Sequence, residues 1–253
     1  MVELAPIHQQ LIESVPVKVD ARIESENVLY RHGGTELEGL LVGDTTERRV
    51  RPGVLILHDW SGVGPNVRMR ATMLARLGYV AFAADLYGKG VRPTGAAASS
   101  EAKKYYDDLT LLRGRVEAGY RRLSADPRVD PDHIAVIGYC FGGAAALEFA
   151  RTSVAASGIV SFHGALIVHD PSDAAQIRSP LLVLTGGSDP VVPDHVVTAF
   201  MDELRAAPDV DWQLIAYGGA PHAFTVPGSD RYRPLTDARS WRALVSFLRE
   251  VFR

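Results

Sequence analysis

The stretch IAVIGYCFGG, residues 134–143, places the only cysteine of this 253-residue chain between glycines, directly after a run of strand-forming residues. Gly138, Cys140 and Gly142 have the G-x-nucleophile-x-G spacing of a nucleophile elbow, with cysteine where serine is more common. An elbow needs glycine on both sides because the strand and the helix approach closely at the turn. The stretch therefore predicts a strand, a sharp turn that carries the thiol, and then a helix.

The position of Cys140 at this turn favours a catalytic role. The N-terminus of the following helix stabilises thiolate over thiol. The backbone N–H of Phe141, the next residue, is expected to donate to an oxyanion. The alternative is a cysteine that only packs inside a glycine-rich turn, since free cysteine is among the most buried residue types. The strand, the two glycines and the small-residue helix together favour catalysis.

Short apolar runs recur after Pro52 and are typical of strands covered on both faces. They are VLILHD, YVAFAAD, IAVIGY, GIVSFHG, LLVLTGG and WQLIAY. Helical patterns separate most of them, over residues 67–78, 99–123, 141–150, 196–206 and 234–251. This alternation predicts an α/β fold with a mostly parallel central sheet and helices on both faces. No repeat or linker divides the chain, so residues 1–253 are expected to form a single domain.

The chain before Pro52 has a different pattern. Residues 1–17 show no clear period and are expected to be a loosely attached lead-in. An alternating stretch near residues 18–24 predicts a half-buried strand. Gly33-Gly34 separates VLYRH from TELEGLLV, which predicts an N-terminal antiparallel hairpin. Further on, residues 87–123 are expected to form a lid-like insertion, and the Gly-, Ala- and Ser-rich residues 87–100 a mobile loop near the site.

Composition excludes several classes of function. A formal net charge of -3 gives no reason to expect nucleic acid or an anionic membrane as a partner. One cysteine cannot form an internal disulfide, and the N-terminal stretch MVELAPIHQQLIES lacks the features of a signal peptide. No run approaches the ~20 apolar residues of a membrane span. Histidines and the cysteine form no cluster at metal-ligand spacing. We expect a cytoplasmic protein without a metal or another cofactor, acting on a small molecule.

A catalytic thiol needs a base and a group that orients the base, and in this elbow architecture both follow the nucleophile in the chain. Asp189 comes just after the strand run LLVLTGG, and His222 lies in a loop after the last strand run. Asp189 could instead cap the next helix, but Asp194 is the better candidate for that cap. Of eight histidines, His222 has the required order, and His163, at the end of an earlier strand, is expected to line the pocket.

The second oxyanion donor is expected in the loop after the first central strand, LILHDWSGVG. There the backbone N–H of Trp60 is the candidate, and Asp59 beside it predicts a carboxylate near the sulfur. The alternative is that Asp59 only caps the helix that follows, since aspartate is a preferred cap residue.

Five blocks together resemble the dienelactone hydrolase family, cysteine members of the α/β-hydrolase fold. The blocks are LILHDWSGVGPNVR, YVAFAADLYGKG, IAVIGYCFGGAAAL, LLVLTGGSDPVVP and YGGAPHAF, in the order and spacing of the family. The resemblance runs from about Leu40 to the C-terminus. It implies that Cys140 is the nucleophile, His222 the base and Asp189 its orienting acid.

Two departures from the family pattern bear on the substrate. The family's glutamate that pairs with the resting thiol falls on Asp59, which is one methylene shorter; Glu36 is not its equivalent, because it lies in the hairpin. The arginine that holds a substrate carboxylate in the dienelactone-cleaving members falls on Val226. The second carboxylate-binding arginine of those members has no obvious match in the lid segment of this chain, although Arg92 is nearby in sequence. With Phe224 and Trp60 also expected to line the pocket, a neutral, largely apolar substrate is predicted.

The sequence therefore predicts a hydrolase of small activated carboxylic esters or lactones that works through a Cys-His-Asp triad and a thioester acyl-enzyme. Two alternatives stay open. The chain could be a non-catalytic small-molecule binding module on the same fold, with the thiol left unactivated. It could also be an acyltransferase that passes the acyl group to an alcohol or thiol rather than to water.

Overall fold

A computed structural model describes residues 4–253, which divide into two compact units, one ending at Ile134 and the other beginning at Ala135. The strands of the first unit follow the order β1-β2-β4-β3. β1 pairs antiparallel with β2, β2 antiparallel with β4, and β4 parallel with β3. The strand bounds are β1 Ile23–His32, β2 Thr35–Asp44, β3 Arg51–Leu57 and β4 Val80–Ala84. The helix bounds are α1 Pro6–Glu13, α2 Pro65–Arg76, α3 Gly95–Tyr106 and α4 Leu109–Ser124.

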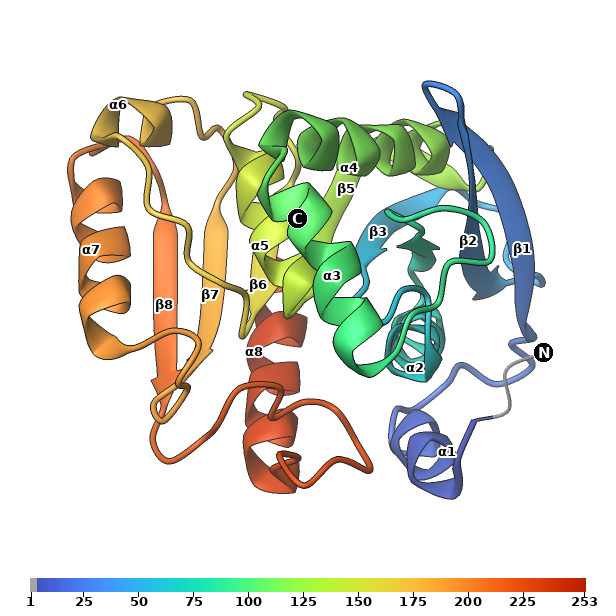
Figure 1. Ribbon diagram of the computed structural model, residues 1–253. Helices are drawn as coiled ribbons and strands as arrows, with labels where there is room; N and C mark the ends of the chain where they lie inside the picture. Colours follow the sequence, from blue (N-terminus) through green and yellow to red (C-terminus); the bar gives the residue numbers. More distant parts are fainter. Residues whose placement is uncertain (1–3) are drawn as a thin grey trace. The chain divides into compact units, whose positions relative to one another are not determined.

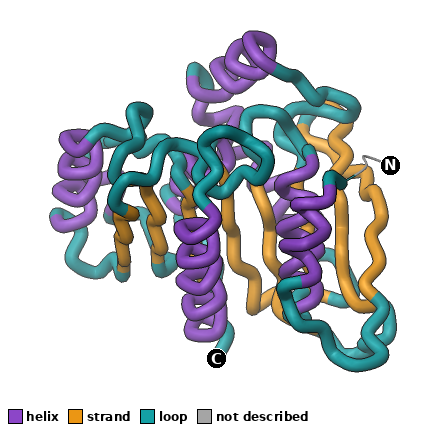
Figure 2. The backbone as a smooth tube through the Cα atoms, turned by 90° about the horizontal axis from the view of Figure 1, so that it is seen from below, coloured by secondary structure: helices purple, strands orange, loops and turns teal. Residues whose placement is uncertain are grey.

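In the second unit four parallel strands follow the chain order β5-β6-β7-β8 (Figure 1). The first residues of β5 still belong to the first unit. The strand bounds are β5 Val129–Tyr139, β6 Gly158–Phe162, β7 Leu181–Gly186 and β8 Trp212–Tyr217. The helix bounds are α5 Phe141–Ala150, α6 Pro171–Ala174, α7 Asp194–Arg205 and α8 Pro234–Val251, the last ending near the C-terminus (Figure 2).

Strand β6 shows that helices cover both faces of the parallel strands in the second unit. A Cβ at Gly158 would lie 2.6 Å from the ring of Phe247 in α8. A Cβ at Gly143 in α5 would lie 2.8 Å from the hydroxyl of Ser161. Because Gly158 and Ser161 are three residues apart, their side chains point to opposite faces of the strand. Helices α5 and α8 therefore pack on opposite faces, as the continuous apolar runs predict.

The predicted hairpin is confirmed, but the prediction for the segment before it is wrong. β1 and β2 pair from Ile23 with Asp44 to His32 with Thr35, across Gly33-Gly34. The stretch near residues 18–24 turns instead of extending: Asp20 has a φ of 68°, and the N–H of Ala21 donates to the carbonyl of Lys18 at 3.1 Å. The strand begins only at Ile23, because the alternating pattern contains a left-handed turn residue.

Of the predicted lead-in, residues 1–3 lie outside the described part of the chain, and residues 4–17 are more firmly attached than the sequence suggests. Helix α1 packs against α2 and buries His8 and Ile12. Just beyond it, the Nε of Arg76 in α2 donates to the carbonyl of Val15 at 2.7 Å. This helix was not predicted because its eight residues are too few to show a helical period clearly.

The segment predicted as one long helix over residues 99–123 is two helices, α3 and α4. Asp107 follows the end of α3, and Asp108 is the N-cap of α4. The carboxylate of Asp108 accepts the backbone N–H of Leu111 at 2.9 Å, as an N-cap aspartate does. This capping bond begins a new helix and explains the break.

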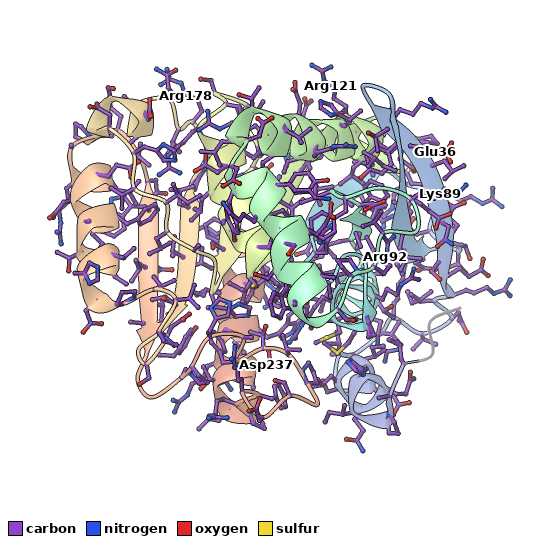
Figure 3. All side chains as sticks on the ribbon, viewed as in Figure 1. Glu36, Lys89, Arg92, Arg121, Arg178 and Asp237 are labelled. Atoms are coloured by element: carbon purple, nitrogen blue, oxygen red, sulfur yellow. The ribbon has the colours of Figure 1, made fainter. Side chains whose placement is uncertain are left out.

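The loop that precedes α3 is tied to its own unit at several points. The buried carboxylate of Asp85 accepts the backbone N–H groups of Tyr87 and Gly88, at 3.1 and 3.2 Å. Lys89 donates its N–H to the carbonyl of Glu36 and forms an ion pair with the Glu36 carboxylate at 3.0 Å (Figure 3). These bonds anchor the start of the segment predicted to be mobile, and its action as a lid stays a prediction.

None of the helices within residues 4–253 has the length and apolar character that crossing a membrane requires.

Candidate active site

Cys140 stands at the turn between β5 and α5, in the conformation that a nucleophile elbow demands. Its φ is 54° and its ψ is -114°, a region that costs a residue with a side chain on the order of 1–3 kcal/mol. The turn is held from both sides: the N–H of Cys140 donates to the carbonyl of Phe162, and its carbonyl accepts from Gly143, both at 2.9 Å. The predicted strand, turn and helix are confirmed.

Gly138 explains why the elbow has glycine two residues before the cysteine. A Cβ at this position would lie 1.9 Å from the carbonyl oxygen of Gly142, far inside van der Waals contact. The obstacle is backbone rather than a movable side chain, so the turn cannot relax to accept it. The start of α5 is approached closely at a second point, since a Cβ at Gly164 would lie 2.5 Å from the carbonyl carbon of Gly143. The elbow is thus fixed between two backbone contacts that only glycine permits.

The structure brings Cys140, His222 and Asp189 together within the second unit. The Nε2 atom of His222 lies 3.1 Å from the Sγ atom of Cys140, and its Nδ1 atom lies 2.8 Å from the Oδ2 atom of Asp189. Asp189 follows β7 and His222 follows β8, so both come from the carboxyl ends of parallel strands. One imidazole therefore joins the thiol to the carboxylate, in the chain order predicted from the sequence.

Asp189 is held by its own loop as well as by the histidine. It is 4% exposed, and its Oδ1 atom accepts the backbone N–H of Val191 at 2.8 Å. The prediction that Asp194 caps the next helix is wrong: Pro193 is the N-cap of α7, no side chain caps it, and Asp194 is the first helical residue. Asp189 nevertheless binds the histidine, because its two oxygens serve the loop and the imidazole separately.

The electrostatics of the site favour a protonated imidazole. Burial of the His222 ring lowers its pKa, but hydrogen bonds to Asp189 and Cys140 and the negative charges of these two groups outweigh burial and raise the pKa to about 9. An imidazolium between a carboxylate and a sulfur stabilises the thiolate form of that sulfur. At neutral pH the arrangement therefore places a positively charged imidazolium beside the sulfur.

His163 lies behind His222 rather than on the wall of an open pocket. It is 0% exposed, and its ring meets the His222 ring edge to face at a centroid distance of 5.3 Å. Its Nε2 atom is hydrogen-bonded to the hydroxyl of Thr225 at 2.8 Å. The ring of Phe224, also 0% exposed, packs edge to face against His163 at 5.2 Å. The pocket-lining prediction is corrected for both: His163 packs behind the His222 imidazole, and Phe224 packs against His163.

Thr225 is a residue of the site that the sequence did not indicate. Its hydroxyl fixes one nitrogen of His163, and through that ring it restricts the position of His222. Threonine in a loop carries no distinctive signal, and only the fold brings it to a histidine 62 residues earlier in the chain. Val226, the next residue, is partly exposed and sits where the resemblance would place an arginine.

The two residues predicted from the loop after β3 lie in the first unit. Trp60 is 45% exposed, and its carbonyl accepts the hydroxyl of Tyr87 at 3.2 Å. The Oδ1 atom of Asp59 accepts both the N–H and the hydroxyl of Ser61, as in an Asx turn. It does not cap α2, whose N-cap is Gly64. The oxyanion role of Trp60 and the pairing of Asp59 with the sulfur stay predictions.

Arg92 is engaged in holding the loop after β4. Its guanidinium donates to the carbonyls of Val91 at 2.7 Å and Glu38 at 3.2 Å, and lies 3.5 Å from the carboxylate of Asp85 (Figure 3). These contacts satisfy much of its hydrogen-bonding capacity within the first unit. The arginine near the lid segment therefore has a structural explanation.

Comparison with known proteins agrees with this geometry. The sequence pattern of the Dienelactone hydrolase family matches residues 37–252. A probable 2-oxo-3-(5-oxofuran-2-ylidene)propanoate lactonase of Bradyrhizobium is 28% identical, over 78% of this chain and 83% of its own length. A putative carboxymethylenebutenolidase of Methylorubrum extorquens is 25% identical, over 79% of this chain and 72% of its own.

Solved structures extend the likeness to the fold. A dienelactone hydrolase-like promiscuous phosphotriesterase, P91 from metagenomic libraries, superposes with a TM-score of 0.85 at 37% identity, covering 91% of this chain and 99% of its own. A putative dienelactone hydrolase from Klebsiella pneumoniae has a TM-score of 0.74 at 21% identity, with coverages of 90% and 98%. The chain thus has the α/β-hydrolase fold and is a hydrolase of carboxylic esters or lactones. Matched over most of its length, it belongs to the dienelactone hydrolase family.

Proposed function

We propose that the chain hydrolyses small, neutral carboxylic esters or lactones with Cys140 as nucleophile, His222 as acid and base, and Asp189 as the group that orients the imidazole. The observation that carries the proposal is the continuous chain of contacts from the sulfur through the imidazole to the carboxylate, at 3.1 and 2.8 Å. These distances are within hydrogen-bond reach for a nucleophile and its base. The strained elbow that presents the sulfur supports the same role.

The first half of the reaction forms a thioester. The Cys140 thiolate attacks the acyl carbon, and the negative charge moves to the carbonyl oxygen, which accepts the backbone N–H of Phe141 at the positive end of α5. When the tetrahedral adduct collapses, the carbon–oxygen bond to the leaving group breaks. The His222 imidazolium gives its Nε2 proton to the departing alkoxide. The products of this step are an alcohol and the acyl-enzyme.

The second half returns the enzyme to its resting state. Neutral His222 takes a proton from water, and the resulting hydroxide attacks the thioester carbon. Collapse of this second adduct expels the thiolate and releases the carboxylic acid, which restores the ion pair with the imidazolium. Asp189 keeps the Nδ1 proton throughout, so that Nε2 faces the sulfur in every step.

The substrate is proposed to lack a carboxylate at the position that the dienelactone-cleaving members bind. Val226, partly exposed four residues after His222, offers an apolar surface and no charge there. Arg92 is already bonded to backbone carbonyls. A charged substrate group would therefore lose its hydration without gaining a partner. Neutral esters and lactones are expected to be better substrates.

We expect the protein to form an acetyl-enzyme with p-nitrophenyl acetate, because the ester has a good leaving group and no charge. Brief incubation followed by acid quench and intact-mass measurement should show one added acetyl group, and peptide mapping should place it on Cys140. Release of p-nitrophenol without any covalent adduct on Cys140 would contradict the thioester step. A protein that binds the ester without releasing p-nitrophenol would instead be a binding module.

Two variations of this experiment separate the remaining activities. Product analysis with an added alcohol distinguishes hydrolysis from acyl transfer, since an acyltransferase would form a new ester instead of the acid. A p-nitrophenyl phosphotriester tests a second candidate activity, attack of the same thiolate on phosphorus. The 37% identity to the promiscuous phosphotriesterase P91 favours including it.

The pH dependence of acylation should follow the imidazolium. Because the pKa of His222 is raised to about 9, the imidazolium is present at neutral pH and is lost as pH rises through that value. We therefore expect kcat/KM for a neutral ester, corrected for spontaneous hydrolysis, to fall above pH about 9. Far-UV circular dichroism over the same range checks that the fold persists. A rate that keeps rising through pH 10 would indicate that neutral imidazole activates a thiol instead.

A further inference from the structure

Arg51, the first residue of β3, has a buried guanidinium that lacks an acceptor among the residues the structure describes. It is 7% exposed, and none of its three side-chain nitrogens makes a hydrogen bond. Its backbone N–H, by contrast, donates to the carbonyl of Arg128 at 3.0 Å. Burying a charge without hydrogen bonds is costly, because the hydration it loses is not replaced. The residues that the structure describes therefore leave the hydrogen-bonding capacity of this guanidinium unused.

Arg51 is one of the residues that line a cavity. Its volume is about 250 Å³, and its walls come from the chain before β1, the end of β2, the start of β3 and the end of α2, all in the first unit. The charged side chains of the lining are Lys18, Asp44, Glu47, Arg49, Arg51 and Arg76. Four basic groups against two acidic ones leave an excess of positive charge, which favours an anion.

Both acidic groups of the cavity already have partners of their own. The Oδ1 atom of Asp44 accepts the N–H groups of Arg22 and Thr46, at 3.0 and 2.9 Å. Glu47 is paired with Arg49 at 3.3 Å and with Lys18 at 3.5 Å. Neither carboxylate lies within ion-pair distance of the Arg51 guanidinium, although both are near enough to affect its charge. Lys18 and Arg49 are thus paired with Glu47, whereas Arg51 and Arg76 form no ion pair with either carboxylate among the described residues.

Arg76 is the second group positioned to bind an anion. Its Nε atom donates to the carbonyl of Val15 at 2.7 Å, which fixes the guanidinium at the wall of the cavity. A guanidinium presents paired N–H groups in one plane, and this geometry matches two oxygens of a phosphate or a carboxylate. The carbonyls at the end of α2 oppose an anion, but a helix end carries only about half a unit charge.

We propose that this cavity binds a small oxyanion, a phosphate or a carboxylate group, with Arg51 as the principal donor and Arg76 as the second. The site takes no residue from the triad of Cys140, His222 and Asp189, and it is independent of the proposed hydrolase mechanism. A bound oxyanion supplies the acceptors that the buried guanidinium lacks.

Calorimetric titration of the full chain tests the site, with inorganic phosphate, sulfate and succinate in separate arms at equal ionic strength. The phosphate and succinate arms distinguish the two forms of oxyanion, and sodium chloride serves as the blank. We expect saturable binding near one equivalent for at least one of them. Arg51→Met should weaken that binding by about 10–100-fold, the range of a hydrogen bond to a charged group.

Arg48→Met is the matched control, since Arg48 is exposed, lies three residues away and does not line the cavity. It should bind the anion as tightly as the wild type. Absence of saturable binding in all three arms, or equal affinity in Arg51→Met, would overturn the proposal. If Arg51→Met does not fold, Arg76→Met takes its place, and undiminished affinity in that variant would overturn the proposal as well.

Discussion

Cys140→Ala is expected to reduce the turnover of p-nitrophenyl acetate to near the uncatalysed rate, a loss of about 10⁶-fold if the cysteine behaves as nucleophiles of other triads do. Alanine keeps the elbow backbone but removes the atom that attacks the acyl carbon. Initial rates of purified wild type and variant, measured at equal concentration, give the ratio directly. Turnover at the wild-type level in Cys140→Ala would exclude the thioester mechanism.

Cys140→Ser is the informative companion to this variant. Serine retains a hydroxyl at the position of the sulfur, 3.1 Å from His222. A hydroxyl is not ionised at neutral pH, so the imidazole loses the charge that helps to raise its pKa to about 9. The serine variant should therefore turn over p-nitrophenyl acetate more slowly than the wild type and faster than Cys140→Ala. The pH optimum of the serine variant should shift, because His222 must now act as a neutral base on the serine hydroxyl. Equal melting temperatures of the three proteins confirm that the folds are comparable.

Asp189→Asn is expected to cause the second largest loss, up to about 10⁴-fold, as when the aspartate of a serine triad becomes an amide. The amide cannot stabilise an imidazolium as a carboxylate does, and its NH₂ group can force the wrong tautomer on His222. The pKa of His222 should fall along with the rate, since Asp189 both binds the ring and lies beside it as a negative charge. The high-pH limit of kcat/KM should then move below about 9.

Asp194→Asn provides the control for this substitution. Asp194 is exposed at the start of α7, five residues from Asp189, and makes no contact with His222. The Asp194→Asn substitution removes the same charge from the same region without touching the imidazole. The rate and the pH profile of this variant should therefore match those of the wild type. If Asp189→Asn also matches the wild type, the carboxylate is only a turn residue.

The elbow, the strands and the order of the triad were predictable because each depends on local sequence. Gly138 is required by the close carbonyl oxygen of residue 142, four positions later, so its place before the cysteine marks the turn directly. The parallel strands are buried on both faces and appear as unbroken apolar runs. Asp189 and His222 follow such runs, and the topology of parallel strands brings their ends to one edge.

The features that the sequence did not predict depend on contacts between distant segments. His163 looked like a pocket residue because it ends a strand, but its environment comes from Thr225 and Phe224, about 60 residues later. The role of Arg92 is fixed by the carbonyl of Glu38, 54 residues before it. Arg51 begins a buried strand, where a charge has no local explanation. Side-chain partners of this kind are chosen by the fold, and no periodicity encodes them.

The single thiol of the chain has a consequence for how the enzyme would tolerate oxidants. Many redox-sensitive enzymes survive peroxide because a second cysteine traps the sulfenic acid as a disulfide that can later be reduced. Here no other cysteine exists to do so. If Cys140 is the nucleophile, an enzyme molecule whose Cys140 is oxidised is inactive. Its sulfenic acid must then be reduced by a thiol from outside the chain.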